Sequence, residues 1–346
     1  MQRHCRTRKM LNWLKRTLDE FCSRYGSTIL NTISPIWFLL CILGLNWMAY
    51  DHIFEYLYET KTILRMIFQC VTWFMSGQMI IHWIFLCKVK SNYLNTEEDN
   101  AKRLAHEEAN PQFKSEGIEY EQLRQIRPTL GTGNWSVITE YTNNEVKKTA
   151  YPYWGWKPCV VCSFYKPPRC HHCPICNVCI LKRDHHCFFA RQCVGLHNQR
   201  YFVVFNLWAG LLTTFATPQL MYYTYAAVWP HMTAMDLCLP WTLVKYLLGG
   251  TSFYILTVVF QNYSLIFFIL TAGHFLREQL HCIEHGITSF ELDTDNYHLQ
   301  PESKSMHERF ACVFGRENLW LNILIPYHWA SRPTDDGIVW ASMKME

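Results

Sequence analysis

Residues 159–193 read CVVCSFYKPPRCHHCPICNVCILKRDHHCFFARQC, and this stretch holds more potential metal ligands than two zinc ions can bind. Eight cysteines and four histidines lie within it: Cys159, Cys162, Cys170, Cys173, Cys176, Cys179, Cys187, Cys193, His171, His172, His185 and His186. Because a tetrahedral zinc site takes four ligands, two sites use eight of these side chains. Four side chains therefore remain for other chemistry.

Outside this stretch, the apolar residues of the 346-residue chain are gathered in four blocks, over residues 29–50, 63–87, 202–229 and 246–271. A helix needs roughly 20 residues to cross the hydrocarbon core of a bilayer, and each block is long enough. One such block is also typical of a buried helix in a soluble protein, but four blocks with polar segments between them favour membrane spans. The sequence therefore predicts an all-α polytopic membrane protein, with four transmembrane helices and a small zinc-binding domain between helices 2 and 3.

The distribution of lysine and arginine predicts the orientation of these spans. Residues 1–27 carry seven of them, residues 88–200 carry sixteen and residues 276–346 carry six, whereas connections 51–62 and 230–241 carry one and none. By the positive-inside rule, both termini and the large central segment are expected in the cytosol. In that reducing compartment a cysteine-rich stretch is typical of metal binding or catalysis, and disulfides are not expected.

These patterns divide the chain into six segments. They are a basic cytosolic N-terminus (1–28), helices 1 and 2 (29–87), a cytosolic linker (88–150), the cysteine-rich zinc domain (151–201), helices 3 and 4 (202–275) and a cytosolic tail (276–346). The N-terminus is basic before any apolar run begins, so no cleavable signal peptide is expected. It is either an amphipathic helix on the anionic leaflet or a solvated flank that sets orientation. The net charge of +4 is too small to indicate a nucleic-acid partner.

A RING-type ubiquitin ligase also interleaves two zinc sites built from cysteine and histidine. That pattern closes with a Cys-x-x-Cys step, whereas five residues separate Cys187 from Cys193 here. The spacing therefore disfavours a ligase.

The run Asp184-His185-His186-Cys187 suggests nucleophilic chemistry instead. In an extended segment alternate side chains point the same way, so His185 and Cys187 face one side and His186 the other. An imidazole that takes the thiol proton produces the thiolate, which is the nucleophilic form. Asp184 is able to orient His185 if the chain bends before it. The alternative is that Cys187 is a further zinc ligand.

The order C-x2-C-x9-H-C-x2-C-x2-C-x4-D-H-H-C-x5-C-x4-N resembles the cysteine-rich domain of the DHHC family of protein S-acyltransferases, or palmitoyltransferases. The resemblance implies two structural zinc sites, one on Cys159, Cys162, His172 and Cys179, the other on Cys173, Cys176, His186 and Cys193. Spacing alone leaves a sequential pairing of the ligands equally open. The resemblance also implies that Cys187 accepts the acyl group, with His185 as its base and Asp184 polarising His185.

For such an enzyme, the implied reaction moves a palmitoyl or other long-chain acyl group from acyl-CoA to cysteines of membrane-associated proteins, through a thioester on Cys187. The acyl chain is expected in a cavity among the four spans, and a Golgi or endoplasmic reticulum membrane is the expected location. The CoA phosphates need cations, and the nearby candidates are Lys166, Arg169, Lys182 and Arg183. The alternative for these charges is attraction to the anionic leaflet.

Two shorter stretches also resemble the family: Thr288-Ser289-Phe290-Glu291 resembles its Thr-Thr-x-Glu motif, and residues 313–320 resemble its C-terminal signature. Phe188-Phe189 stand where many members have Pro-Trp, Gln192 where an asparagine is usual, and Arg309 where an asparagine is frequent. These departures leave the nucleophile, base and metal ligands intact. They are the basis for an alternative function, a weakly active or inactive membrane scaffold.

Overall fold

The computed structural model describes residues 2–111, 114–122, 135–142, 145–293, 305–316, 319–325, 333–338 and 340. Within these residues, four helical segments are long and apolar enough to cross a membrane: Tyr25–Leu57, Thr62–Lys88, Gln199–His231 and Phe253–His285. The cysteine-rich region lies between the second and the third. The predicted fold, four spans with a metal-binding region in the middle of the chain, is therefore confirmed.

The helices in chain order are α1 (Gln2–Met48), α2 (Phe54–Leu57), α3 (Thr62–Lys88), α4 (Glu97–Ala109), α6 (Gln199–Tyr223), α7 (Leu239–Leu247), α8 (Phe253–His285), α9 (Ser289–Asp293), α10 (Met306–Phe314) and α11 (Leu319–Leu324). The fourth span begins later than the predicted residue 246. Gly249 has a φ of +74°, which ends the preceding helix. Ser252 then caps α8, accepting a hydrogen bond from the backbone N–H of Ile255 at 3.3 Å.

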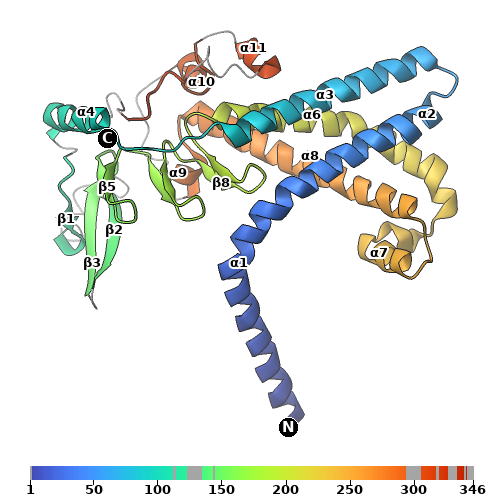
Figure 1. Cartoon of the computed structure of the whole chain (residues 1–346), viewed down its shortest axis with the longest axis horizontal. Helices are drawn as coiled ribbons and strands as arrows, with labels where there is room; N and C mark the ends of the chain where they lie inside the picture. The colour runs from blue at the N-terminus through green and yellow to red at the C-terminus, as the bar shows by residue number, and fades with distance from the viewer. Residues whose placement is uncertain are drawn as a thin grey trace.

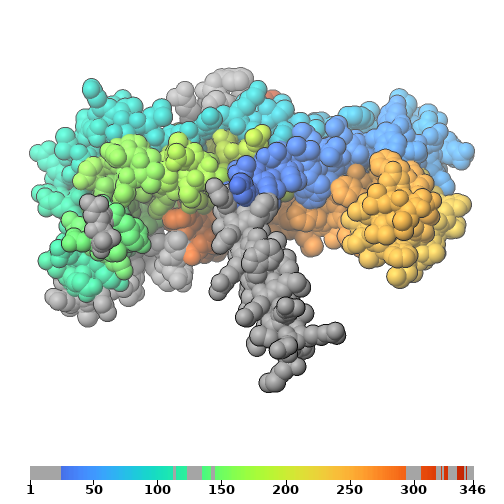
Figure 2. Space-filling model, turned by 60° about the horizontal axis from the view of Figure 1, so that its bottom comes forward, coloured from blue at the N-terminus to red at the C-terminus, as the bar shows by residue number. Residues whose placement is uncertain are grey.

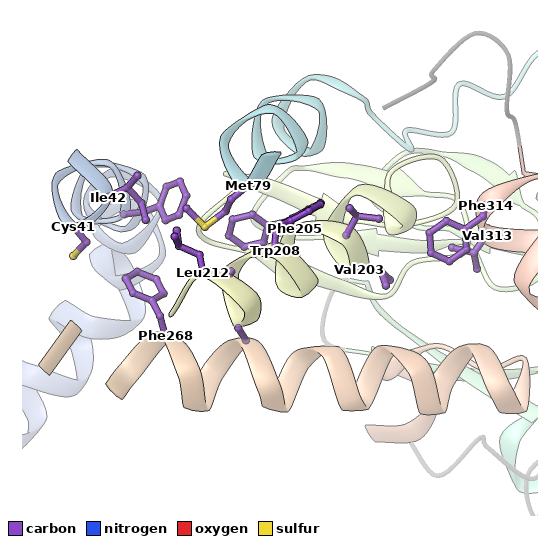
Figure 3. Close-up of a cluster of buried hydrophobic side chains, with 14 of the residues drawn as sticks. Cys41, Ile42, Met79, Val203, Phe205, Trp208, Leu212, Phe268, Val313 and Phe314 are labelled. Atoms are coloured by element: carbon purple, nitrogen blue, oxygen red, sulfur yellow. The ribbon is translucent and has the colours of Figure 1, made fainter. Parts of the chain in front are cut away.

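Helix α6 lies between α3 and α8 and carries much of the buried core (Figures 1 and 3). Phe205 packs edge-on against Phe38 of α1, with ring centroids 5.5 Å apart, and Leu212 is fully buried. By contrast, large apolar side chains such as Leu43, Ile63 and Leu270 are exposed on the outer faces of the spans. An exposed apolar surface of this extent suits contact with lipid.

The predicted linker contains folded elements of its own. Helix α4 begins with a capping box. The Thr96 hydroxyl accepts a hydrogen bond from the backbone N–H of Asp99, and the Asp99 carboxylate accepts one from the backbone N–H of Thr96. Strands β1 (Ile118–Glu119), β2 (Trp135–Thr142) and β3 (Glu145–Pro152) form an antiparallel sheet in the order β1-β3-β2. This sheet was not predicted from the sequence.

The cysteine-rich region consists of three antiparallel hairpins, each with two three-residue strands. They are β4 (Lys157–Cys159) with β5 (Phe164–Lys166), β6 (His171–Cys173) with β7 (Val178–Ile180), and β8 (His185–Cys187) with β9 (Gln192–Val194). This region and α7 lie at opposite ends of the helical bundle (Figures 1 and 2). The hairpins therefore meet the bundle at the end where α3 finishes and α6 begins.

Candidate active site and metal centres

The three hairpins repeat one local design. The first strand of each ends in a cysteine, which pairs across the hairpin with the residue five positions later: Cys159 with Phe164, Cys173 with Val178 and Cys187 with Gln192. The residue before that partner has a positive φ in all three, 57° at Ser163, 55° at Asn177 and 56° at Arg191. Only a few per cent of non-glycine residues adopt this left-handed conformation. Its recurrence shows that the three turns share one backbone shape.

The hairpin register explains how the two metal sites interleave. His172 lies directly opposite Cys179, and His186 lies directly opposite Cys193. Directly opposed residues project on the same face of a hairpin, roughly 5 Å apart. Each pair joins the two turn cysteines of the preceding hairpin. The structure therefore brings together Cys159, Cys162, His172 and Cys179, and separately Cys173, Cys176, His186 and Cys193.

Both groups have the dimensions of a tetrahedral zinc site. In the first, the Cys162 sulfur lies 3.3 Å from His172 Nδ1 and 3.8 Å from the Cys179 sulfur. In the second, His186 Nδ1 lies 3.3, 3.7 and 3.8 Å from the sulfurs of Cys176, Cys173 and Cys193. A tetrahedron with zinc–ligand bonds of about 2.0–2.3 Å has edges of about 3.3–3.8 Å. These residues therefore fit zinc, which would tie each hairpin to the next.

The third hairpin carries an alanine at the position of the second turn cysteine. Cys162 and Cys176 each follow the strand-ending cysteine by three residues, and Ala190 occupies that position after Cys187. The third turn consequently supplies only one thiol, and no fourth hairpin follows it among the described residues to complete a site. Cys187 thus has the position of a zinc ligand, but no described metal-ligand group includes it.

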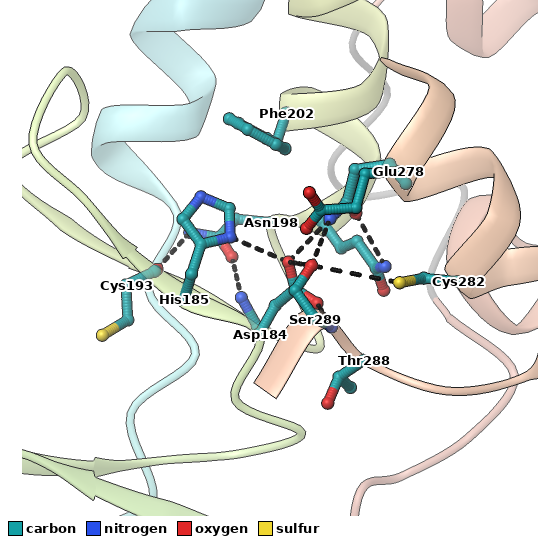
Figure 4. A network of polar contacts seen from close by, with 12 residues as sticks. Asp184, His185, Cys193, Asn198, Phe202, Glu278, Cys282, Thr288 and Ser289 are labelled. Carbon is teal, nitrogen blue, oxygen red and sulfur yellow. Dashed lines mark hydrogen bonds and ion pairs between the residues drawn. The ribbon is translucent and has the colours of Figure 1, made fainter. Parts of the chain in front are cut away.

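Cys187 and His185 lie on the side of β8 opposite to His186, as the alternation of an extended strand predicts. His185 Nδ1 hydrogen-bonds Asp184 Oδ2 at 2.8 Å (Figure 4). Burial alone would lower the pKa of His185, but its hydrogen bonds to Asp184 and Cys187 raise that pKa to about 10. The imidazole is therefore positively charged at neutral pH, next to the Cys187 thiol.

Asp184 is itself held by groups from the end of α8 and the start of α9. Its Oδ1 accepts a hydrogen bond from the backbone N–H of Ser289 at 2.7 Å (Figure 4). Its Oδ2 accepts one from Gln279 Nε2 at 2.7 Å. Burial would raise the pKa of Asp184, yet these hydrogen bonds and the charge on His185 hold it below its usual value. The bend that brings Asp184 to His185 follows Lys182, which has a φ of +43°.

We expect Asp184→Asn to slow alkylation of Cys187 at neutral pH by about tenfold or more. An adjacent charge, such as that of Asp184 beside His185, typically shifts the pKa of its neighbour by about 1–3 units. Without the carboxylate, His185 loses its proton at lower pH and the thiolate loses its counter-charge. The rate of iodoacetamide labelling of Cys187 at pH 7, compared between wild type and the variant, measures this effect. Equal rates would contradict the role of Asp184.

A cavity of about 360 Å³ opens from this site into the helical bundle. The third hairpin, with Cys187 and His185, forms one wall of this cavity, and α1, α6 and α8 line the other sides through residues such as Trp37, Phe205 and Phe268. Its size falls in the range of about 300–1,000 Å³ that is typical of small-molecule sites. The lining is almost entirely apolar, which suits a hydrocarbon ligand.

Asn31, which was not predicted as a site residue, contacts a metal-ligand candidate from a distant part of the chain. Its Oδ1 lies 3.0 Å from His186 Nε2, while His186 Nδ1 faces the three sulfurs. A ligating histidine commonly donates its other ring N–H to an oxygen, which fixes its tautomer and orientation. A polar residue at the start of an apolar block was the only sequence signal for it.

Asn31→Leu is expected to weaken zinc binding at the second site by about 10–100-fold, the usual effect of losing such a partner. The rate at which a chelator removes zinc from the purified protein measures this effect. Asn31→Asp retains an acceptor oxygen and serves as the matched control. Equal zinc retention in Asn31→Leu and wild type would show that the contact contributes nothing.

The structure corrects part of the predicted phosphate-binding set. Arg169 is 2% exposed, and its Nε and Nη2 donate to the two carboxylate oxygens of Glu291 at 2.6 Å. Lys182 is also buried, which lowers its pKa. Neither cation faces solvent, so neither is available to CoA phosphates. Lys166 and Arg183 are partly exposed, and their role remains a prediction.

The residues that depart from the family pattern all have defined contacts. Gln192 Nε2 donates to the backbone carbonyls of Leu86 and Val89 at the end of α3. The carbonyl of Phe189 accepts from Trp83 Nε1 at 2.9 Å, and Phe188 packs on His186. The contacts of Gln192 and Phe189 fasten the third hairpin to α3.

The two short stretches that resembled the family also have structural roles. Glu291 pairs with Arg169, and Ser289 holds Asp184. Val313 and Phe314 of α10 enter the core beside α6 (Figure 3). Arg309 Nη1 donates to the backbone carbonyl of Glu284. Asn318 of the same stretch lies outside the described residues.

The region that contains this site is similar to a known protein family and to several curated proteins. Residues 154–296 match the model of a family described as DHHC palmitoyltransferase. The chain is 55% identical over 60 residues to "Probable palmitoyltransferase ZDHHC24" of Danio rerio. The aligned stretch covers 17% of this chain and 20% of that protein. It is 41% identical over 76 residues to "Probable protein S-acyltransferase 7" of Arabidopsis thaliana (22% and 15%), and 39% over 84 residues to "Palmitoyltransferase erf2" of Emericella nidulans (24% and 13%). The chain thus spans about a fifth or less of the length of these relatives.

Proposed function

Because residues 154–296 constitute a DHHC palmitoyltransferase domain, we propose that this protein is an S-acyltransferase, which moves a long-chain fatty acyl group from acyl-CoA to cysteines of other proteins. One observation carries the proposal. A cysteine that is free of both zinc groups, next to an aspartate-supported histidine, lies on the wall of an apolar cavity inside a membrane-spanning bundle.

The reaction proceeds in two thioester exchanges. The Cys187 thiolate attacks the acyl carbonyl of acyl-CoA, the carbon–sulfur bond to CoA breaks, and the departing CoA sulfur takes a proton from His185. A substrate cysteine then gives its proton to His185 and attacks the acyl-enzyme, which releases the Cys187 thiolate. One thioester replaces another in each step, so the chemistry needs no external energy source. Asp184 keeps His185 oriented and stabilises its charged form throughout.

The cavity and the metal sites serve this chemistry without taking part in it. An acyl chain that enters the cavity is removed from water, which is worth about 0.8 kcal/mol per methylene. The binding free energy of the acyl group therefore becomes more favourable as the acyl chain lengthens, which favours long-chain donors. Zinc in the two groups would hold the hairpins in register, and His186 precedes Cys187 directly, so the second site fixes the position of the nucleophile. Lys166 and Arg183 are the cations left for the CoA phosphates.

The distribution of basic residues supports a cytosolic orientation for the site and for both termini. Substrates are then membrane-associated proteins whose cysteines reach that face, and an endomembrane of the Golgi or endoplasmic reticulum is the proposed location. The contacts of Phe188, Phe189 and Gln192 leave the Asp184–His185 pair in place. An active enzyme is therefore favoured over an inactive scaffold.

The test is incubation of the purified full chain, in detergent or nanodiscs, with labelled palmitoyl-CoA. The expected result is a covalent label that neutral hydroxylamine removes, and its transfer to an added cysteine-containing peptide. Metal analysis of the same sample, after dialysis against a weak chelator, should give about two zinc ions per chain. Protein that retains this zinc but takes up no label would overturn the proposed activity.

A further inference from the structure

The last turn of α8 carries the run His281-Cys282-Ile283-Glu284-His285, which has the order H-x-x-E-H. Cys282 and Ile283 are buried against the rest of the protein. Residues three and four apart share a helix face, so His281, Glu284 and His285 project together on the outer side. Two imidazoles and a carboxylate on one outward face form a ligand set of the kind that binds zinc.

We propose that His281, Glu284 and His285 form a third metal site, which binds a divalent transition-metal ion and suits Zn²⁺. One donor atom from each residue lies within 4.8 Å of the other two, before any side-chain adjustment. The two imidazole rings lie 4.2 Å apart between centroids. Imidazole and carboxylate together select zinc and its neighbours over calcium and magnesium, which prefer oxygen ligands alone.

The tautomer of His285 is already set for metal binding. Its Nδ1 lies 3.0 Å from the backbone carbonyl of His281, so this nitrogen carries the proton and donates it. The lone pair is then on Nε2, which is free to coordinate. Histidines that ligate metals commonly donate their other ring N–H to a backbone carbonyl in this way.

The site lies outside the hydrocarbon core and is open to dissolved ions. Helix α8 has 33 residues and is about 50 Å long, whereas the core of a bilayer is about 30 Å thick. The polar residues His274, Arg277 and Glu278 mark where the helix leaves the apolar region, one to two turns before the site. The site is therefore on the same side of the membrane as the cysteine-rich region.

Neighbouring positive charge limits the affinity but leaves the ligands available. Arg277 lies one turn before His281, and Arg309 donates to the backbone carbonyl of Glu284, not to its carboxylate. With three protein ligands, at least one coordination position is left for water. The third ion is consequently held more weakly than ions in the two four-ligand groups, and it exchanges with the free metal in solution.

A bound ion would link three side chains within the last turn of α8. This turn lies just before Gly286, where the chain changes direction with a φ of +67°. The segment that follows supplies Ser289 to Asp184 and Glu291 to Arg169. Figure 4 shows Cys282 of this turn beside Ser289. The ion would therefore stiffen the part of α8 that supports the candidate site, whether or not the protein is an acyltransferase.

Equilibrium dialysis of the full chain in nanodiscs against buffered free Zn²⁺ tests the site. Wild type is expected to reach a third bound zinc per chain at micromolar free zinc. His281→Ala and His285→Ala should keep the two tight ions and weaken the third by at least about tenfold, since even loss of an outer partner costs about 10–100-fold. Saturation of wild type at two ions, or an unchanged third ion in both variants, would overturn the proposal.

The matched control is His274→Ala, which removes the other histidine–carboxylate pair of the same helix, His274 with Glu278 at 3.3 Å. This pair lacks a second histidine, so the control should still bind the third ion. Hydrogen exchange gives an independent readout: Zn²⁺ should slow exchange at residues 281–286 in wild type and in the control. Slowing that persists in His285→Ala would place the ion elsewhere and reject the site.

Discussion

Cys187→Ser is expected to reduce acyl-enzyme formation from palmitoyl-CoA by at least about a thousandfold, because removal of a nucleophile leaves only the residual rate of the surrounding site. A serine hydroxyl does not ionise near neutral pH, so the imidazolium of His185 has no thiolate to stabilise. The substitution is nearly isosteric, and Cys187 lies outside both metal groups. The fold and the zinc content should therefore remain unchanged.

The measurement is hydroxylamine-sensitive label from palmitoyl-CoA in matched preparations of wild type and Cys187→Ser. Cys87, at the end of α3, packs in the same buried cluster as Cys187 and provides the control thiol. Cys87→Ser should retain the label, since no histidine–carboxylate pair contacts Cys87 among the residues that the structure describes. Equal labelling of wild type and Cys187→Ser would move the nucleophile to another residue. Loss of zinc from Cys187→Ser would instead show that Cys187 is a metal ligand.

The sequence predicted the features that depend on local order. Four apolar blocks were enough for the spans, because length and composition decide whether a helix can enter a bilayer. Alternation along an extended strand placed His185 and Cys187 on one side and His186 on the other. The substitution of Ala190 for a turn cysteine was also visible in the sequence. Its meaning needed the register of the three hairpins, which shows that the turns are equivalent.

Features that depend on contacts between distant segments could not be predicted in the same way. His186 and Asn31 are 155 positions apart, and Arg169 and Glu291 are 122 apart. Which residues meet over such distances depends on how α1 and α8 pack against the hairpins. Arg169 is an example: beside a cysteine-rich stretch it suggested phosphate binding, yet it pairs with a buried carboxylate. Basic residues carry no local signal of their own burial.

Arg169→Ala is expected to lower the free energy of unfolding by about 3–5 kcal/mol, the usual effect of removing one partner from a buried ion pair. The Glu291 carboxylate would remain in the protein interior, with hydrogen bonds from Tyr153 and the backbone of Thr288 but without its ion-pair partner. The ion pair of Arg169 with Glu291 would also no longer connect the second hairpin to α9. Thermal or denaturant unfolding of the purified protein measures the effect. Release of the tightly bound zinc provides the signal that reports unfolding.

A double variant separates this structural role from phosphate binding. Removing both charges of a buried pair is far less costly than removing one, so Arg169→Met with Glu291→Gln, which keeps an acceptor oxygen for Tyr153 and Thr288, should recover part of the lost stability. If Arg169 instead bound CoA, Arg169→Ala would raise the KM for palmitoyl-CoA without altering unfolding, and the second substitution would restore nothing. Lys166→Ala is the comparison for a phosphate contact, because Lys166 is partly exposed. Lys166→Ala should raise the KM for palmitoyl-CoA and leave the free energy of unfolding unchanged. Arg169→Ala should lower the free energy of unfolding and leave that KM unchanged.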